Sequence, residues 1–277
     1  MRQSAMLHKS ADGPALQRAG ASGTLRGDTA AAMSFSFDFS GKTALVTGGV
    51  SGIGAAASLA FKRSGAKVIA CGLTDDELAA ARASPDFAGV DIRKLDVTDA
   101  KAVAELVGGL ASLDFVVNSA GMIRRDAEHS PEVFEQVIDV NLNGGMRVTA
   151  AARPLLAKRK GAVVFIASVM SFFGGPKQPA YSASKGAVRN LTMSLAAAYA
   201  ADGIRVNAVA PGWVITNLSK GARENPERNA QILARIPLAR WAEPAEIADP
   251  ILFLCSDAAR YVTGTVMLVD GGYTSVG

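Results

Sequence analysis

The 277-residue sequence contains little cysteine and little histidine. Its two cysteines, Cys71 and Cys255, lie far apart in apolar surroundings, and neither has the spacing of a disulfide framework or a metal site. The two histidines, His8 and His129, are too few to complete a metal cluster with them. We therefore expect a reducing, cytoplasmic environment and no bound metal.

The sequence also lacks a long apolar run and a strong excess of either charge. No stretch approaches the roughly 18 consecutive apolar residues that a membrane span needs, so we expect no membrane partner. The formal net charge is +4, and residues 1–32 hold four basic residues against two acidic ones. The rest of the chain is thus close to neutral and lacks the basic surface of a nucleic-acid-binding protein.

What remains is the composition of a globular protein. Apolar residues make up 49% and charged residues 19%, and the length suits a single α/β domain. Residues 1–34 differ, because they are rich in Ala, Gly, Ser and Arg without an apolar period or the core of a secretory signal. We expect a flexible extension there, with Met33 as an alternative start or the segment as a transit peptide, and a folded domain over residues 35–277.

From residue 41 onward, short apolar runs alternate with helical segments, a pattern that predicts a doubly wound, seven-stranded parallel sheet. We expect strands at residues 43–47, 67–70, 90–95, 113–117, 162–167, 204–210 and 265–269. We expect helices at residues 53–64, 74–83, 99–108, 131–158, 180–201 and 244–256. Residues 211–243 form the one long excursion, which predicts a partly helical lobe over a site.

Tyr181 and Lys185 lie four residues apart in the helix expected at residues 180–201. One helical turn separates them, so their side chains project from the same face. A lysine cation beside a tyrosine favours the phenolate and lowers the pKa of the phenol from its usual value of about 10. This pair therefore predicts a proton donor and acceptor that works near neutral pH, although such pairs are also common on ordinary helices.

A glycine-rich turn, with Gly48, Gly52 and Gly54, joins the first strand to the first helix. Its glycines allow a tight turn and a close approach of the backbone, while the helix N-terminus offers unpaired N–H groups to anionic oxygens. In this position the turn predicts binding of the pyrophosphate of a dinucleotide.

The end of the second strand bears on the choice between NAD and NADP. The strand ends at Leu73 without an acidic residue until Asp75, and without a Lys or Arg to bind an extra ribose phosphate. The glycine turn likewise has Ser51 where a basic residue could stand. We therefore favour NAD over NADP, with Leu73 packed near the ribose.

Polar residues follow three more strands, at the edge where an open α/β sheet binds its ligand. Asp96, followed by Val97, either accepts a hydrogen bond from an adenine amino group or caps the next turn. Asn118 either braces the crevice through backbone bonds or only forms a turn. Ser168 is placed to orient the substrate oxygen that Tyr181 protonates. Asn141 stands in an apolar run and either has a role in the site or is a core amide.

In this order the motifs resemble those of the short-chain dehydrogenase/reductase family, from about Gly41 to Gly277. The resemblance implies a Rossmann fold, a nicotinamide cofactor and a homotetramer. It also implies that Tyr181 is the general acid/base, that Lys185 tunes it and holds the nicotinamide ribose, that Ser168 orients substrate and that Asn141 holds a relay water. Ser119 departs from the second Asn that is frequent in the family. The implied cofactor contacts are Gly48, Ser51, Gly52, Ile53, Gly54, Leu73, Asp96, Val97, Asn118, Ala120, Gly121, Tyr181, Lys185, Pro211, Gly212, Val214 and Thr216.

A narrower resemblance is to the sugar-acid branch of this family, which includes 2-deoxy-D-gluconate 3-dehydrogenases and gluconate 5-dehydrogenases. It rests on residues 120–125, 168–175 and 235–241. Such a substrate carries a carboxylate, and Arg124, Arg125 and Lys177 are cations near the expected site. Each is either a substrate ligand or a solvated loop charge.

Two alternatives stand beside a dehydrogenase of small sugar acids. The first is an NADPH-dependent 3-oxoacyl-thioester reductase, which would need a cation at the second strand. The second is a regulatory protein that binds a dinucleotide without catalysis. The complete set of Asn141, Ser168, Tyr181 and Lys185 argues against the second alternative.

Overall fold

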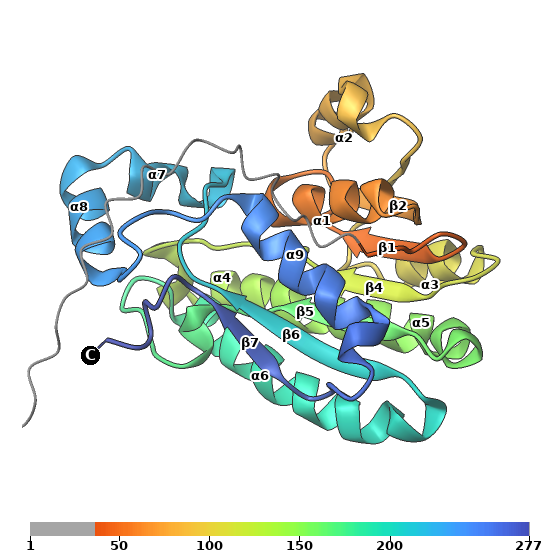
Figure 1. The fold of residues 1–277 in the computed structure, drawn as a ribbon. Coiled ribbons are helices and arrows are strands. Elements are labelled where there is room, and N and C mark those ends of the chain that lie inside the picture. The colour runs from red at the N-terminus through yellow and green to blue at the C-terminus, as the bar shows by residue number, and fades with distance from the viewer. Residues whose placement is uncertain (1–36, 277) are drawn as a thin grey trace, which may run out of the picture. The chain divides into compact units, whose positions relative to one another are not determined.

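The computed structural model describes residues 37–276 and contains a seven-stranded, all-parallel sheet (Figure 1). The strands are β1 Thr43–Thr47, β2 Lys67–Gly72, β3 Asp91–Lys94, β4 Phe115–Asn118, β5 Ala162–Ile166, β6 Arg205–Pro211 and β7 Val266–Val269. Their order across the sheet is β3-β2-β1-β4-β5-β6-β7. This confirms the expected doubly wound sheet, while the expected extension at residues 1–34 lies outside the described residues.

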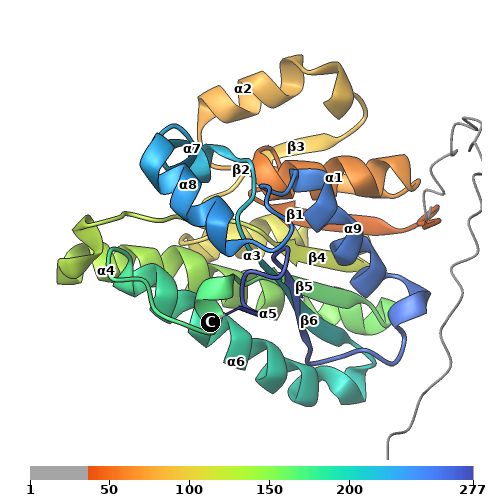
Figure 2. The same cartoon turned by 60° about the vertical axis from the view of Figure 1, so that its left-hand side comes forward.

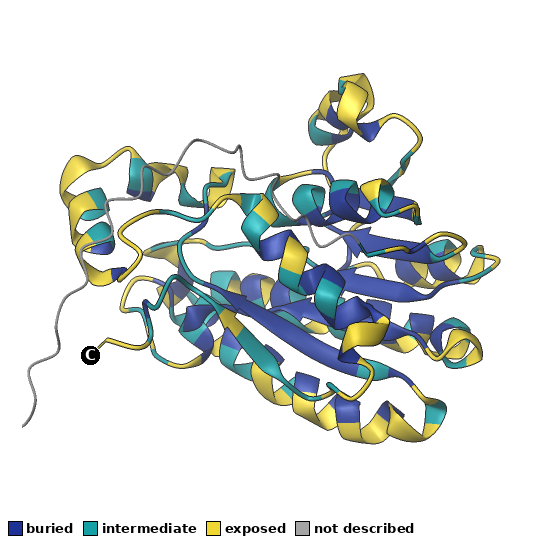
Figure 3. Ribbon diagram, in the orientation of Figure 1, coloured by how far each residue is buried: buried dark blue, intermediate teal, exposed yellow. Residues whose placement is uncertain are grey.

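The central strands are apolar on both faces, as a sheet covered by helices on both sides requires. Along β1, Ala44 and Val46 face one core and Leu45 faces the other. In β4, Phe115 and Val117 share the first core, while Val116 belongs to the second. Figure 3 shows these strands as the continuous buried centre of the domain.

Helices form the outer layers (Figure 2). They are α1 Gly52–Arg63, α2 Asp75–Ala83, α3 Ala100–Gly108, α4 Pro131–Ile138, α5 Gly145–Arg159, α6 Pro179–Tyr199, α7 Lys220–Arg223, α8 Pro226–Arg235 and α9 Pro244–Cys255. Apolar residues of α1 and α9 cover one face of the sheet, and those of α3, α5 and α6 cover the other. None of the helices in residues 37–276 is long and apolar enough to cross a membrane.

The single helix expected at residues 131–158 is interrupted. Between α4 and α5 lies a π-helical segment, Asp139–Gly144, which contains Asn141. The apolar periodicity extends across it, so sequence reasoning could not detect the interruption. Such segments are often found at functional sites, and this one places the Asn141 amide against the loop after β4.

Residues 211–243 contain α7 and α8, so this excursion is partly helical. An aromatic contact between Trp213 and Trp241, whose ring centroids lie 5.3 Å apart, joins the two ends of this excursion. The Trp241 indole also donates a 2.7 Å hydrogen bond to Asn229 of α8. We call residues 211–243 the lobe.

Candidate functional site

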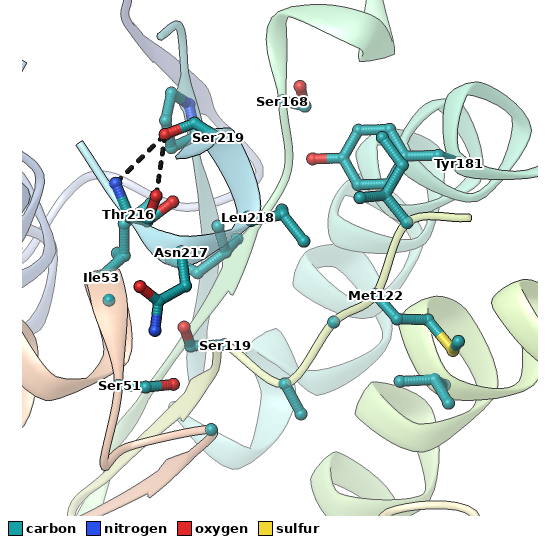
Figure 4. Close-up of a pocket in the computed structure, with 18 of the residues that line it drawn as sticks. Ser51, Ile53, Ser119, Met122, Ser168, Tyr181, Thr216, Asn217, Leu218 and Ser219 are labelled. Atoms are coloured by element: carbon teal, nitrogen blue, oxygen red, sulfur yellow. Dashed lines mark hydrogen bonds between the residues drawn. The ribbon is translucent and has the colours of Figure 1, made fainter. Parts of the chain in front are cut away.

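A cavity of about 500 Å³ opens at the carboxyl ends of the strands, where the strand order reverses between β1 and β4. This is the place where open α/β sheets bind their ligands. The walls come from the loops after the first six strands, β1 to β6, and the start of α6 closes one end (Figure 4).

The glycine turn fits a pyrophosphate. Gly48 has φ +60°, and a Cβ there would lie 3.0 Å from the backbone of Ala120. A Cβ at Gly54 would lie 2.1 Å from the Gly48 carbonyl oxygen, so only glycine allows the turn to fold onto α1. No side chain caps α1 at Ser51, and the first-turn N–H groups therefore remain available to anionic oxygens. Gly48, Ser51, Gly52 and Ile53 line the cavity, whereas Gly54 packs beneath the turn.

The loop after β4 is braced differently from what the sequence suggested. The Thr47 hydroxyl accepts hydrogen bonds from the N–H groups of Ser119 and Ala120, both at 3.2 Å. The Asn118 amide instead donates to the Thr149 hydroxyl and does not line the cavity. Ala120 and Gly121 do line it. Thr47 was missed because a threonine at the end of a strand gives no distinct signal.

The end of β2 carries an acidic group that sequence reasoning also missed. Glu77, in the first turn of α2, folds back and accepts hydrogen bonds from the N–H groups of Leu73 and Thr74. A Cβ built on Gly72 would lie 2.9 Å from Glu77 Oε1, so this carboxylate occupies the space of a strand-terminal acidic side chain. The available signal was the Thr-x-x-Glu pattern of residues 74–77, which forms a capping box at the start of α2.

The residues near the end of β2 differ in whether they line the cavity. Leu73 is 52% exposed and forms part of the wall. Asp75 points away and pairs with Lys94 at 2.9 Å. Asp96 accepts hydrogen bonds from the backbone and the hydroxyl of Thr98, at 2.8 and 2.7 Å. Its capping role is therefore present, and both Asp96 and Val97 also line the cavity.

Tyr181, Ser168 and Lys185 meet at the opposite end of the cavity, and Figure 4 shows the Tyr181 and Ser168 side chains beside the same space. Lys185 is 5% exposed and donates a 2.6 Å hydrogen bond to the Ile166 carbonyl, with Nζ 5.5 Å from the centroid of the Tyr181 ring. Burial lowers the pKa of Lys185 to about 8.

We expected Lys185 to lower the pKa of Tyr181, and this expectation is wrong. Burial raises the pKa of Tyr181, while the Ser168 hydroxyl and the Arg125 cation oppose this rise. The physical reason is that desolvation disfavours the phenolate and the Lys185 ammonium is engaged by the Ile166 carbonyl. In this structure the phenol therefore holds its proton at neutral pH.

Asn141 is buried beside this group without lining the cavity. Its side chain accepts from the N–H of Met122 at 2.8 Å and donates to the Met122 carbonyl at 2.9 Å. It also donates to the Ser184 hydroxyl at 3.1 Å. These contacts link the loop after β4 to α6, and the role in holding a relay water stays a prediction.

Two of the three cations that were expected near a substrate line the cavity, namely Arg124 and Arg125. Arg125 donates a 2.6 Å hydrogen bond to Gln178, a buried residue that sequence reasoning did not single out. Burial lowers the pKa of Arg125, and the nearby Arg228 cation lowers it further. Lys177 is exposed outside the cavity wall and lies 3.7 Å from Asp126, which supports the solvated alternative for this residue.

The lobe supplies the remaining wall. Pro211, Gly212, Val214 and Thr216, which the resemblance implies as cofactor contacts, line the cavity. The Thr216 N–H bonds to the Ser219 hydroxyl at 3.1 Å, which holds the turn drawn in Figure 4. Leu218, half exposed, lies over the same space.

Comparisons with known proteins agree with this geometry. A family model described as enoyl-(acyl carrier protein) reductase matches residues 48–274. The 2-dehydro-3-deoxy-D-gluconate 5-dehydrogenase of Pseudoalteromonas atlantica is 38% identical over 250 residues, covering 86% of this chain and 97% of that protein. The 3-oxoacyl-[acyl-carrier-protein] reductase of Thermotoga maritima is 40% identical, covering 84% of this chain and 97% of that protein.

A solved structure is similar over the same region. It is described as an NAD(P)-dependent gluconate 5-dehydrogenase from Beutenbergia cavernae with NADP bound at low occupancy. The TM-score is 0.79 at 40% sequence identity, covering 86% of this chain and 99% of that one.

Proposed function

Because the chain belongs to the short-chain dehydrogenase/reductase family and is a nicotinamide-dependent oxidoreductase, we propose that it interconverts a secondary hydroxyl and a ketone on a small sugar acid. The observation that carries this proposal is that one cavity joins a proton-transfer group, Tyr181 with Ser168, to two arginines, Arg124 and Arg125. A polar substrate with an anionic end matches both parts of the cavity.

The chain's own residues suit the proton transfer. Ser168 and Tyr181 would hold the substrate hydroxyl, and Tyr181 would take its proton during oxidation and return it during reduction. A bound nicotinamide, held by the glycine turn and by Lys185, would accept or supply the hydride. Asn141 keeps α6 and the loop after β4 in place around the reacting group.

The anionic end of the substrate is assigned to Arg125. Its guanidinium is partly desolvated, lies near a second cation, Arg228, and is oriented by Gln178. A carboxylate would relieve this repulsion and form charge-assisted hydrogen bonds. Arg124 lines the same wall but is exposed, so we assign it a smaller contribution than Arg125 to binding the substrate carboxylate.

For the cofactor we favour NAD. The Glu77 carboxylate at the end of β2 could accept hydrogen bonds from ribose hydroxyls, and it would repel a ribose phosphate. In residues 37–276, the cavity wall around Leu73 includes no Lys or Arg that would neutralise that phosphate. The NADP in the Beutenbergia structure belongs to that protein, and titration of this protein with NAD and with NADP tests the preference.

The test is an initial-rate comparison. We expect NAD-dependent oxidation of D-gluconate or 2-deoxy-D-gluconate, with weaker activity for a 3-oxoacyl thioester and NADPH. The thioester reduction is the second candidate, which the Thermotoga relative favours. Faster thioester reduction with NADPH would overturn the sugar-acid proposal. The homotetramer implied by the family remains a prediction, which sedimentation of the purified protein would check.

A further inference from the structure

Glu128 is a buried acidic residue behind the wall of the cavity. It lies in a short 3₁₀ helix, Ala127–His129, between β4 and α4, and only 1% of it is exposed. It does not line the cavity, so it touches neither substrate nor cofactor directly. A carboxylate is costly to bury unless hydrogen bonds compensate for its lost hydration, and the partners of Glu128 therefore indicate its role.

Both carboxylate oxygens accept backbone hydrogen bonds from the site. Glu128 Oε1 accepts from the N–H of Arg124, and Oε2 accepts from the N–H of Tyr181, each at 2.8 Å. The second bond satisfies an unpaired N–H in the first turn of α6, where the helix dipole also favours a negative charge. One side chain thus bridges the loop of the substrate arginines and the helix of the proton-transfer tyrosine.

The same two segments are joined at their outer ends. The Asp126 N–H donates to the Lys177 carbonyl at 2.7 Å, and the His129 Nε2 lies 3.0 Å from the Pro176 carbonyl oxygen. These contacts keep the segments adjacent, but they are partly exposed. Glu128 bonds directly to the backbone of two residues that line the cavity, Arg124 and Tyr181.

We propose that Glu128 is a positioning residue that sets the separation between the arginine loop and Tyr181, and thereby selects which hydroxyl of the sugar acid meets Tyr181. This inference rests on the proposed function, in which the carboxylate end is held by Arg125. With the carboxylate fixed, the distance to Tyr181 determines which carbon along the substrate is presented. A displacement of about 1 Å at such a site costs roughly a hundredfold in rate.

The test replaces Glu128 by Gln in the full-length protein, with Glu135→Gln on exposed α4 as the matched control. Glutamine keeps the shape but has one oxygen, so one of the two backbone N–H groups loses its acceptor. We expect faster amide hydrogen exchange in the segment whose N–H group loses its acceptor, either residues 122–126 or residues 179–183. With D-gluconate and 2-deoxy-D-gluconate we expect kcat to fall about tenfold or more, and the products to include more than one ketone isomer.

The cofactor dissociation constant should change little, because Glu128 makes no hydrogen bond to the glycine turn or to Lys185. A general loss of structure would weaken cofactor binding as well. Glu128→Asp provides a second variant that keeps the charge but is one methylene shorter. The inference is overturned if exchange rises in neither segment, or if kcat and product composition stay within about twofold of the unmodified enzyme. If the unmodified enzyme oxidises neither acid, the proposed function fails, while the exchange measurement still decides whether Glu128 joins the two segments.

Discussion

The two ends of the cavity are built in different ways. At the end that carries Tyr181, the neighbouring Ser168 and Lys185 are 7% and 5% exposed and are held by β5 and α6. At the end of β2, Leu73 is 52% exposed and the acidic group comes from the first turn of α2, a helix that is largely exposed in Figure 3. The proton-transfer residues are therefore held by the core, while the cofactor choice that we propose depends on one surface helix.

The largest effect should come from Tyr181→Phe at the buried end. This change removes the proton donor and acceptor but keeps the ring, so kcat should fall by about 10²- to 10⁴-fold. The cofactor dissociation constant, measured by fluorescence titration, should change little. Tyr261→Phe, at a fully exposed tyrosine, provides the control. Near-normal turnover by Tyr181→Phe would remove Tyr181 from the reaction.

Lys185 makes the buried end sensitive to pH. Its pKa is lowered by burial from 10.5 to about 8, so between these values the unfolded chain binds more protons than the folded one. Stability should therefore rise with pH across this window, by up to about 3 kcal/mol for this group. Urea unfolding at pH 7.5 and pH 10 should show this rise in the unmodified protein relative to Lys185→Met. Parallel pH dependences for the two proteins would contradict the desolvation of Lys185.

Arg125→Met tests whether the cavity wall between the two ends binds the substrate carboxylate. Loss of a charge-assisted bond to the substrate carboxylate should raise KM for the sugar acid roughly 10- to 100-fold. Lys177→Met is the matched control, since Lys177 pairs with Asp126 outside the cavity wall. Equal effects of the two changes on KM would contradict the assignment of Arg125.

Glu77→Gln should have the smallest effect and should act only on cofactor choice. Removing the charge weakens the binding of NAD and relieves the repulsion of the ribose phosphate of NADP. The ratio of the NADP dissociation constant to the NAD dissociation constant should therefore fall about tenfold. Asp75→Asn makes the same charge change in the same helical turn and should leave the ratio unchanged. A change in kcat without a change in this ratio would contradict the role of Glu77.

The sheet was predictable because its strands are short apolar runs at regular intervals, and the resemblance located the lining glycines and Tyr181. Glu77 was not predictable as a ligand, because its place beside Gly72 depends on a side chain that folds back across a capping box. Gln178 escaped notice for a similar reason, since only the folded chain brings it to Arg125, 53 residues away in sequence.

The pKa of Tyr181 was misjudged because spacing along a helix reveals a neighbouring charge but not the depth of burial. The sequence placed Lys185 one turn away, yet desolvation dominates in the structure and the ammonium is bound to a carbonyl. Electrostatic predictions from sequence therefore fail first where the site is most buried.

The π-helical segment at Asp139–Gly144 also constrains how this chain can change over generations. Helical residues follow one another by about 100° around the axis, so losing a single residue there would turn α5 by that angle relative to α4. The change would yield a more regular helix, yet it would rotate either Asn141 away from Met122 or Val148 away from the core. Descendants of this sequence should tolerate substitutions in the segment more readily than a change in its length.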